Sequence, residues 1–290
     1  MTTPRHSGFA TVLHPDAYAV DWPGFYERAL KEGQGVRARF AHSVERYGSD
    51  DEHQVLNVFR PAGAVGAPVL VFFHGGRWRE GHPDYYDALA APWVEAGVVF
   101  VSAGYRLEAQ ATKRQAVDDA AAAVRRVVAR AADWGGDPAR LSLAGHSAGA
   151  HLAAMVAATA HGQALLRDAL SAPVRSLVGV SGVYDIRADE SGADGEALSP
   201  TLQVAGSVPE TVVAYGVPEL NAVAAPSSFF SDQGEAFASA LRAHGATVAE
   251  VPLPDHDHIR TAQAFGTAGS PLFERALRAV TAVSHEEVAR

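Results

Sequence analysis

The sequence predicts an α/β fold, in which a mostly parallel central sheet is covered by helices on both faces. Short apolar runs such as V-L-V-F-F (69–73) and V-V-F-V-S-A (98–103) have the continuous hydrophobicity of strands buried on both sides. Segments with helical periodicity lie between such runs, for example residues 113–130, which are rich in strong helix formers. Strands that alternate with helices form parallel sheets covered on both faces.

The first part of the chain predicts an irregular arm, one short helix and a hairpin. Residues 1–20 lack periodicity, and D-W-P-G-F-Y-E-R-A-L (21–30) is typical of a helix with proline in its first turn. Two strand-like runs follow at 36–44 and 53–60, separated by a turn at 48–51. This arrangement predicts an opening antiparallel hairpin.

The rest of the chain continues the alternation. Further helices are expected at 84–96, 147–160, 231–244 and 271–283, and further strands at 140–145, 176–182, 211–216 and 246–253. Residues 184–209 carry Gly, Ser, Asp and Pro with little periodicity, which predicts an insertion or small lid. No linker divides the sequence, so we expect one domain over 1–290.

Composition narrows the function classes. The 290 residues are 48% hydrophobic, enough for a large core in one domain. The net charge is −9 and no Lys/Arg cluster occurs, which argues against nucleic acid or an anionic membrane as a partner. The absence of cysteine excludes disulfides, thiolate catalysis and Cys-ligated metals. With no signal peptide or spanning segment visible, we expect a cytoplasmic protein that binds a small molecule. A homodimer remains open.

A serine between two glycines, G-H-S-A-G (145–149), joins a predicted strand to a predicted helix. One sharp turn there strains the backbone of Ser147, and its neighbours at 145 and 149 must lack side chains for strand and helix to approach. The hydroxyl then protrudes beyond the carboxyl end of a strand, where open parallel sheets bind ligands. The pattern predicts a nucleophile elbow. The alternative is a serine that caps a helix after a glycine turn.

A second glycine motif, F-F-H-G-G-R-W (72–78), follows the first buried strand. Backbone N–H groups of glycines suit an oxyanion hole, because substrate can approach them closely. We therefore expect the N–H groups of Gly75 and Gly76 to hold an oxyanion together with that of Ala148 at the helix N-terminus. His74 is expected to hold this loop in place. The alternative for Gly75 and Gly76 is a plain turn without a catalytic role.

Together the two motifs resemble those of α/β-hydrolases of the H-G-G-containing branch. H-G-G-x-W (74–78) and G-H-S-A-G-A-H-L (145–152) are similar to the kynurenine formamidase (arylformamidase) group and its related carboxylesterases. Further matches are S-A-G-Y-R-L (102–107), G-G-D-P (135–138) and S-G-V-Y-D (181–185), and the resemblance covers about residues 45–280. It implies the α/β-hydrolase fold and a serine hydrolase that works through an acyl-enzyme, with no metal or organic cofactor.

The same resemblance indicates the general base. The chain order in this fold is serine, then acid, then histidine. L-P-D-H-D-H-I (253–259) matches the family's histidine stretch, with Asp257-His258-Ile259 in the best overlay. This favours His258 as base, with His256 as the alternative. A metal site at D-H-D-H is disfavoured, because no further ligands lie at a recognisable spacing.

The acid should follow the strand at 211–216. Glu219 lies at the position where the family carries its Asp or Glu, so it is expected to orient the imidazole. Asp232 and Asp185 are the alternatives, and a surface-loop role for Glu219 is also open.

Four side chains near these motifs are candidates for substrate binding: Trp78, Tyr105, His146 and Tyr184. The three aromatic residues follow strands at the expected active edge, and aromatic walls suit an aryl substrate. The alternative is that they pack the loops.

Three functions compete on this evidence. The first is hydrolysis of a small aryl N-formyl amide such as N-formyl-kynurenine. The second is a general carboxylesterase for short acyl or aryl esters. The third is a member of the fold that binds a ligand or acts without hydrolysis. An intact Ser147, glycine motif and late histidine favour the first two.

Overall fold

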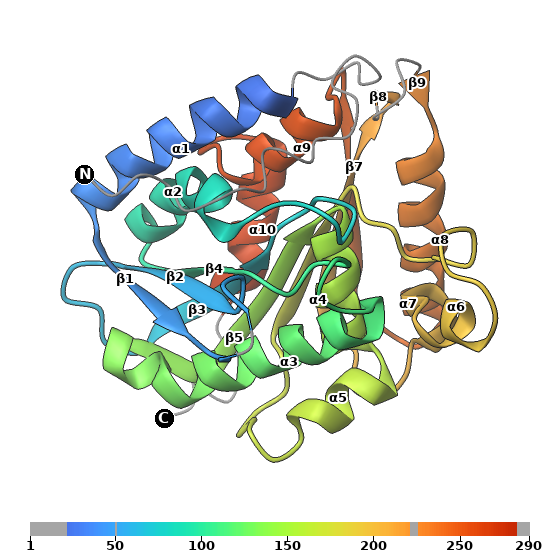
Figure 1. The fold of residues 1–290 in the computed structure, drawn as a ribbon, viewed down its shortest axis with the longest axis horizontal. Coiled ribbons are helices and arrows are strands. Elements are labelled where there is room, and N and C mark those ends of the chain that lie inside the picture. Colours follow the sequence, from blue (N-terminus) through green and yellow to red (C-terminus); the bar gives the residue numbers. More distant parts are fainter. Residues whose placement is uncertain (1–21, 50, 221–225, 283–290) are drawn as a thin grey trace.

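The computed structural model describes residues 22–49, 51–220 and 226–282, so the predicted arm at 1–20 lies outside the described residues. A central sheet of eight strands has the order β1-β2-β4-β3-β5-β6-β7-β10 (Figure 1). β1 (Ala41–Arg46) and β2 (Val55–Arg60) form the predicted antiparallel hairpin, and β2 continues antiparallel to β4 (Val99–Ala103).

The remaining strands run parallel to β4. They are β3 (Ala67–Phe73), β5 (Gly136–His146), β6 (Ser176–Val180), β7 (Glu210–Val217) and β10 (Val248–Pro254). Because these strands are parallel, their carboxyl ends meet at one edge of the sheet. The segments that directly follow them carry the candidate residues.

Helices cover both faces, as predicted. α3 (Lys113–Arg130), α4 (Ala148–Ala158) and α8 (Phe229–Ala243) pack on one face, and α1 (Trp22–Arg39), α2 (Ala90–Glu95), α9 (His258–Phe265) and α10 (Pro271–Thr281) pack on the other (Figure 1). Side chains alternate along β3 accordingly: Val69 and Val71 join the core under α3 and α4, whereas Leu70 and Phe72 join the core under α1 and α10.

The N-terminal helix is longer than predicted. It runs to Arg39, so the strand expected from residue 36 begins only at Ala41. The cause is a contact between segments far apart in the sequence: the Arg37 guanidinium donates to the carboxylates of Asp84 and Asp87 at 2.6 and 2.7 Å. Tertiary contacts of this kind override local strand preference.

Three other segments differ from prediction. The helix expected at 84–96 is a 3₁₀ helix, η3 (Pro83–Leu89), followed by α2. The helix expected at 147–160 ends at Ala158, because Thr159 is extended and caps a separate helix, α5 (Ala160–Leu166). α9 was not predicted.

Residues 184–209 contain two short helices, α6 (Ala193–Ala197) and α7 (Pro200–Gln203). Ser199 ties the segment together, because its hydroxyl donates to the Gly195 carbonyl and accepts from the Ile186 amide. A lid role for this segment stays a prediction. Near the end of β7 lie two short strands, β8 (Glu219–Leu220) and β9 (Pro226–Ser227). Among the described helices, none has the length and apolar character needed to cross a membrane.

Candidate active site

Ser147 is the single residue between β5 and α4. Its φ and ψ of 54° and −120° place it in a strained conformation that side chains rarely adopt. The strain is held by the sheet, because the Ser147 amide donates to the Val180 carbonyl at the end of β6. This is the geometry of a nucleophile elbow.

The flanking glycines are required for steric reasons. A Cβ at Gly145 would lie 2.2 Å from the Gly149 carbonyl oxygen, and one at Gly149 would lie 2.0 Å from the Phe73 carbonyl oxygen. Both distances are far below van der Waals contact. The two glycines therefore allow α4 to pack closely on β5 and β3, as the sequence predicts. This close packing places the serine at the edge of the sheet.

The glycine loop after β3 lies against the serine. A Cβ at Gly75 would lie 3.2 Å from the Cβ of Ser147, so the loop backbone approaches the serine as closely as only glycine permits. Gly76 has a φ of 127° and would place a Cβ 2.0 Å from the Glu80 carbonyl oxygen. Ala148 is the first residue of α4, where helix N–H groups have no partner within the helix. The structure thus places Gly75 against Ser147, with Ala148 directly after the serine at the start of α4, whereas Gly76 packs on Glu80, and an oxyanion hole formed by the three stays a prediction.

Glu219 and His258 are in direct contact. The His258 Nδ1 lies 2.5 Å from the Glu219 Oε1, and both side chains are buried, with 8% and 0% exposed. A carboxylate accepts only, so this bond places a proton on Nδ1 and leaves Nε2 as an acceptor. Charge-assisted bonds of this length are strong and fix the ring orientation.

The Glu219 carboxylate has two further donors. Its Oε2 accepts from the Ser181 hydroxyl at 2.8 Å and from the Gly216 amide at 2.7 Å. Ser181 follows β6 with a φ of 44°, a left-handed conformation that turns its side chain toward the carboxylate. Three donors on one buried carboxylate satisfy most of its hydrogen-bonding capacity.

Two rings enclose the His258 imidazole. Phe230 stacks on one side with ring centroids 4.3 Å apart and an interplanar angle of 19°. His146 lies with its ring centroid 4.4 Å away. Since His146 precedes Ser147 in the chain, this contact places the imidazole close to the serine.

The alternative residues lie elsewhere. The His256 Nδ1 contacts the Pro254 carbonyl oxygen at 2.7 Å instead of a carboxylate. Asp185 pairs with Arg187 at 2.6 Å, and Asp232 accepts from the Ser228 hydroxyl. Within the described part of the chain, no group of three or more histidine or carboxylate side chains is arranged to hold a metal ion.

All four candidate substrate-binding side chains are buried in the structure, and their contact with substrate stays a prediction. Tyr105 is fully buried and donates to the His74 carbonyl at 2.9 Å, and Tyr184 is fully buried and stacks on Phe237. His146 is 1% exposed. The contacts of Tyr105 and Tyr184 are those that the loop-packing alternative expects.

Trp78 lies directly after the glycine turn and is 5% exposed. Its ring packs edge-to-face on His151, and the Lys113 ammonium lies 5.3 Å from the ring centroid. A substrate contact for Trp78 stays a prediction.

The histidines around the serine are held neutral by burial. Burial lowers the pKa of His74 to about 3 and that of His151 to about 4, and it lowers the pKa of His146 well below its ordinary value. Neutral rings can pack against apolar neighbours, and His74 does so between Tyr86 and Tyr105. These rings therefore support the site as packing groups.

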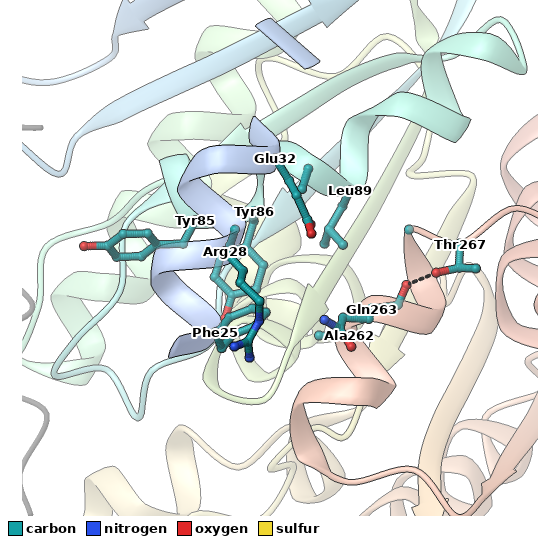
Figure 2. A pocket seen from close by; sticks show the side chains of 12 residues that line it. Phe25, Arg28, Glu32, Tyr85, Tyr86, Leu89, Ala262, Gln263 and Thr267 are labelled. Carbon is teal, nitrogen blue, oxygen red and sulfur yellow. Dashed lines mark hydrogen bonds between the residues drawn. The ribbon is translucent and has the colours of Figure 1, made fainter. Parts of the chain in front are cut away.

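A pocket of about 210 Å³ lies behind this layer, between α1, η3 and α9 (Figure 2). The lining residues include Phe25 on α1, Tyr86 on η3, and Ala262 and Gln263 on α9. Tyr86, which lines the pocket, also stacks on His74 with ring centroids 6.0 Å apart.

Sequence reasoning missed two residues that hold the acid and the histidine. Ser181 belongs to S-G-V-Y-D, which directly follows a predicted strand, so its position at the active edge could have been noticed. Phe230 carries no local signal for a contact with His258, because the two belong to different segments.

The order of these parts along the chain defines the class. The α/β-hydrolase fold carries its serine, its acid and its histidine in this chain order. Here they follow β5, β7 and β10 of the central sheet, which confirms the predicted fold class. Comparison with known proteins agrees. The BD-FAE family model matches residues 56–233, and the chain belongs to this family.

Curated relatives cover parts of the chain. Carboxylesterase NlhH of Mycobacterium tuberculosis is 43% identical over 91 residues, which is 31% of this chain and 28% of the relative. The kynurenine formamidase of Danio rerio is 34% identical over 155 residues, 53% of this chain and 50% of the relative. The chain thus spans half or less of the length of these two relatives.

Solved structures share the fold over most of the chain. A putative thioesterase from Silicibacter sp. TM1040 superposes with a TM-score of 0.76 at 20% identity, covering 93% of this chain and 97% of that one. Butyrate-bound esterase 2 of Thermogutta terrifontis gives a TM-score of 0.65 at 23% identity, covering 82% and 91%. At this identity the likeness concerns the fold.

Proposed function

We propose that this protein is a serine hydrolase that forms an acyl-enzyme on Ser147 and cleaves a small aryl N-formyl amide. The observation that carries the proposal is the 2.5 Å bond between His258 Nδ1 and Glu219 Oε1, beside a serine in a strained elbow. A nucleophile next to a base that is itself oriented by a buried acid is the arrangement that activates serine.

In the first half-reaction, the His258 Nε2 accepts the Ser147 proton as the serine oxygen attacks the carbonyl carbon. The imidazolium that forms is stabilised by the Glu219 carboxylate. The oxyanion lies where the N–H groups of Gly75, Gly76 and Ala148 meet, at the positive end of the α4 dipole. Each such donor contributes about 3 kcal/mol to the transition state.

His258 then returns the proton to the departing amine or alcohol, which completes the first half-reaction and leaves the acyl group on Ser147. Water then enters, gives its proton to the same Nε2 and attacks the ester carbon. The C–O bond to Ser147 breaks, the serine recovers its proton, and the acid product departs. All of the proton transfers use one side chain.

One relative and one side chain favour an aryl formyl amide as substrate. The formamidase of Danio rerio aligns over 53% of the chain, which favours a formyl amide, and Trp78 places an aromatic ring beside the glycine turn. A second candidate is a carboxylesterase for short acyl or aryl esters. The 43% identity to carboxylesterase NlhH favours that activity.

The test compares kcat/KM on N-formyl-kynurenine and on p-nitrophenyl acetate, for the wild type and for Ser147→Ala. Formamide turnover that exceeds ester turnover and disappears in the variant supports the formamidase. Ester turnover alone selects the carboxylesterase. Turnover of neither substrate, or turnover that survives in the variant, overturns the proposal.

A further inference from the structure

We propose that His146 is a positioning residue, which fixes the His258 imidazole against the glycine loop so that base and oxyanion donors keep a constant geometry around the serine. The inference rests on the hydrolase function proposed above. The His146 side chain is 1% exposed, and its described contacts are with the base and with the glycine loop.

The first contact is a hydrogen bond to the backbone that carries the base. The His146 Nε2 donates to the His258 carbonyl oxygen at 2.9 Å, on the first residue of α9. The same carbonyl also accepts from the Thr261 hydroxyl at 3.0 Å. The His146 bond ties the start of α9 to the end of β5 and thereby links the backbone of the base to that of the nucleophile, whereas the Thr261 bond lies within α9.

The second contact is between rings. The His146 centroid lies 4.4 Å from that of His258, and Phe230 stacks at 4.3 Å. Neighbouring rings together with the Nδ1 bond to Glu219 restrict both the tilt and the spin of the imidazole. The direction of its Nε2 is therefore set before substrate arrives, which is the preorganisation that catalysis requires.

The third contact is with the oxyanion loop. The His146 Nδ1 would lie 2.7 Å from a Cβ at Gly75, so the ring edge packs directly on the glycine backbone. Behind it, the Tyr86 ring closes the layer at a centroid distance of 6.5 Å, and Figure 2 shows Tyr86 again among the residues that line the pocket toward α9. The buried His146 ring thus contacts the glycine loop on one side and the His258 imidazole on the other.

Burial determines how this ring can act. It lowers the pKa of His146 well below the ordinary value, with the neighbouring His258 as a further cause, so the ring is neutral at pH 7. A neutral ring has one N–H, and the carbonyl contact assigns it to Nε2. His146 therefore provides one donor and one flat surface, and these two contributions can be separated by substitution.

Three variants separate them. His146→Gln keeps a donor that can reach the carbonyl, His146→Phe keeps a ring without the donor, and His146→Ala removes both. The matched control is His161→Ala, which removes an exposed histidine on α5. Two readouts are compared: kcat and KM for p-nitrophenyl acetate, and the rate at which a fluorophosphonate labels Ser147. Circular dichroism and melting temperatures identify variants that do not fold.

The inference predicts that His146→Ala lowers kcat and the labelling rate by about 100-fold with KM within about threefold, as for a misplaced catalytic group. His146→Gln should stay within about tenfold of the wild type, and His161→Ala should match it. A change confined to KM, or a Gln variant no better than Ala, overturns the inference. If the Ala variant does not fold, the Gln variant must exceed the Phe variant in kcat, and equality overturns it.

The outcomes also separate the two proposals. Failure of the fluorophosphonate to label the wild type refutes the serine hydrolase, and the role of His146 with it. Labelling of the wild type that is unchanged in all three variants refutes only the role of His146.

Discussion

Glu219→Gln is the substitution that probes the candidate site most sharply. The side chain has no exposed surface and accepts three hydrogen bonds, from His258, Ser181 and Gly216. Glutamine has the same shape but no charge, and its amide nitrogen must face at least one of these donors. Where it faces His258, the imidazole proton moves to Nε2 and the ring can no longer accept the Ser147 proton.

The magnitude follows from the charge. The imidazolium formed during reaction lies against the carboxylate, and two unit charges about 4 Å apart interact by about 4 kcal/mol at the effective dielectric of a partly buried site. Loss of that term corresponds to about a 1000-fold decrease in kcat, since about 1.4 kcal/mol is a factor of ten. KM should change little, because Glu219 does not contact substrate in the proposed mechanism.

The assay is steady-state hydrolysis of p-nitrophenyl acetate, with melting temperature as a check on folding. Asp185→Asn and Asp232→Asn are matched controls, since both remove a carboxylate that pairs with surface groups. Each should keep kcat within about threefold, as expected of surface substitutions. The reasoning is refuted if Glu219→Gln keeps more than a tenth of kcat, or if either control loses as much.

Three further predictions follow. Gly75→Ala inserts a Cβ 3.2 Å from that of Ser147, so kcat should fall about 100-fold, as for loss of one oxyanion donor, and an unchanged kcat would contradict the loop assignment. His258→Ala should lower kcat at least about 10⁴-fold, whereas His256→Ala should change it less than about twofold, and the reverse result would exchange their roles. Burial, with Arg37 opposing it, raises the pKa of Asp87 to about 7, so the folded state holds the proton that the unfolded state releases near pH 4. Its contribution to stability is therefore lost as pH rises toward 7, and the unfolding free energy of the wild type should fall relative to Asp87→Asn between pH 5 and 7.5, by at most about 3 kcal/mol; parallel urea-unfolding curves would exclude this.

Much of the elbow is predictable because its constraints are local. The glycines at 145 and 149 are required by contacts within one strand, one helix and the neighbouring β3, and the sequence carries both glycines within five residues. The alternation of strands and helices likewise predicts the sheet, since the central strands β3 and β4 are continuous apolar runs. The carboxyl edge then follows from topology.

The sequence does not reveal contacts between segments that lie far apart along the chain. Nothing local shows that Arg37 reaches Asp84 and Asp87, which extends α1 through a strand-like segment. For the acid, chain order alone leaves Glu219 beside two alternatives, because the lengths of loops after strands are not fixed by the hydrophobic pattern.

The direction of the His146 side chain could have been predicted from the alternation of residues along the strand. Alternate residues on a strand share a face, and Ala144 belongs to the core under α1, α9 and α10. His146 lies two positions on, so its side chain points to the same side, where α9 begins. Proximity to the serine in sequence suggested substrate contact, but strand geometry directs the ring into the interior.

The most direct test of the central claim is to trap the acyl-enzyme. Wild-type protein mixed with p-nitrophenyl acetate and quenched in acid should carry a covalent acetyl group, located by peptide mass spectrometry on Ser147, and Ser147→Ala should carry none. Glu219→Gln should accumulate the adduct far more slowly. An adduct on another residue, or an unmodified wild type that still hydrolyses the ester, would contradict the account.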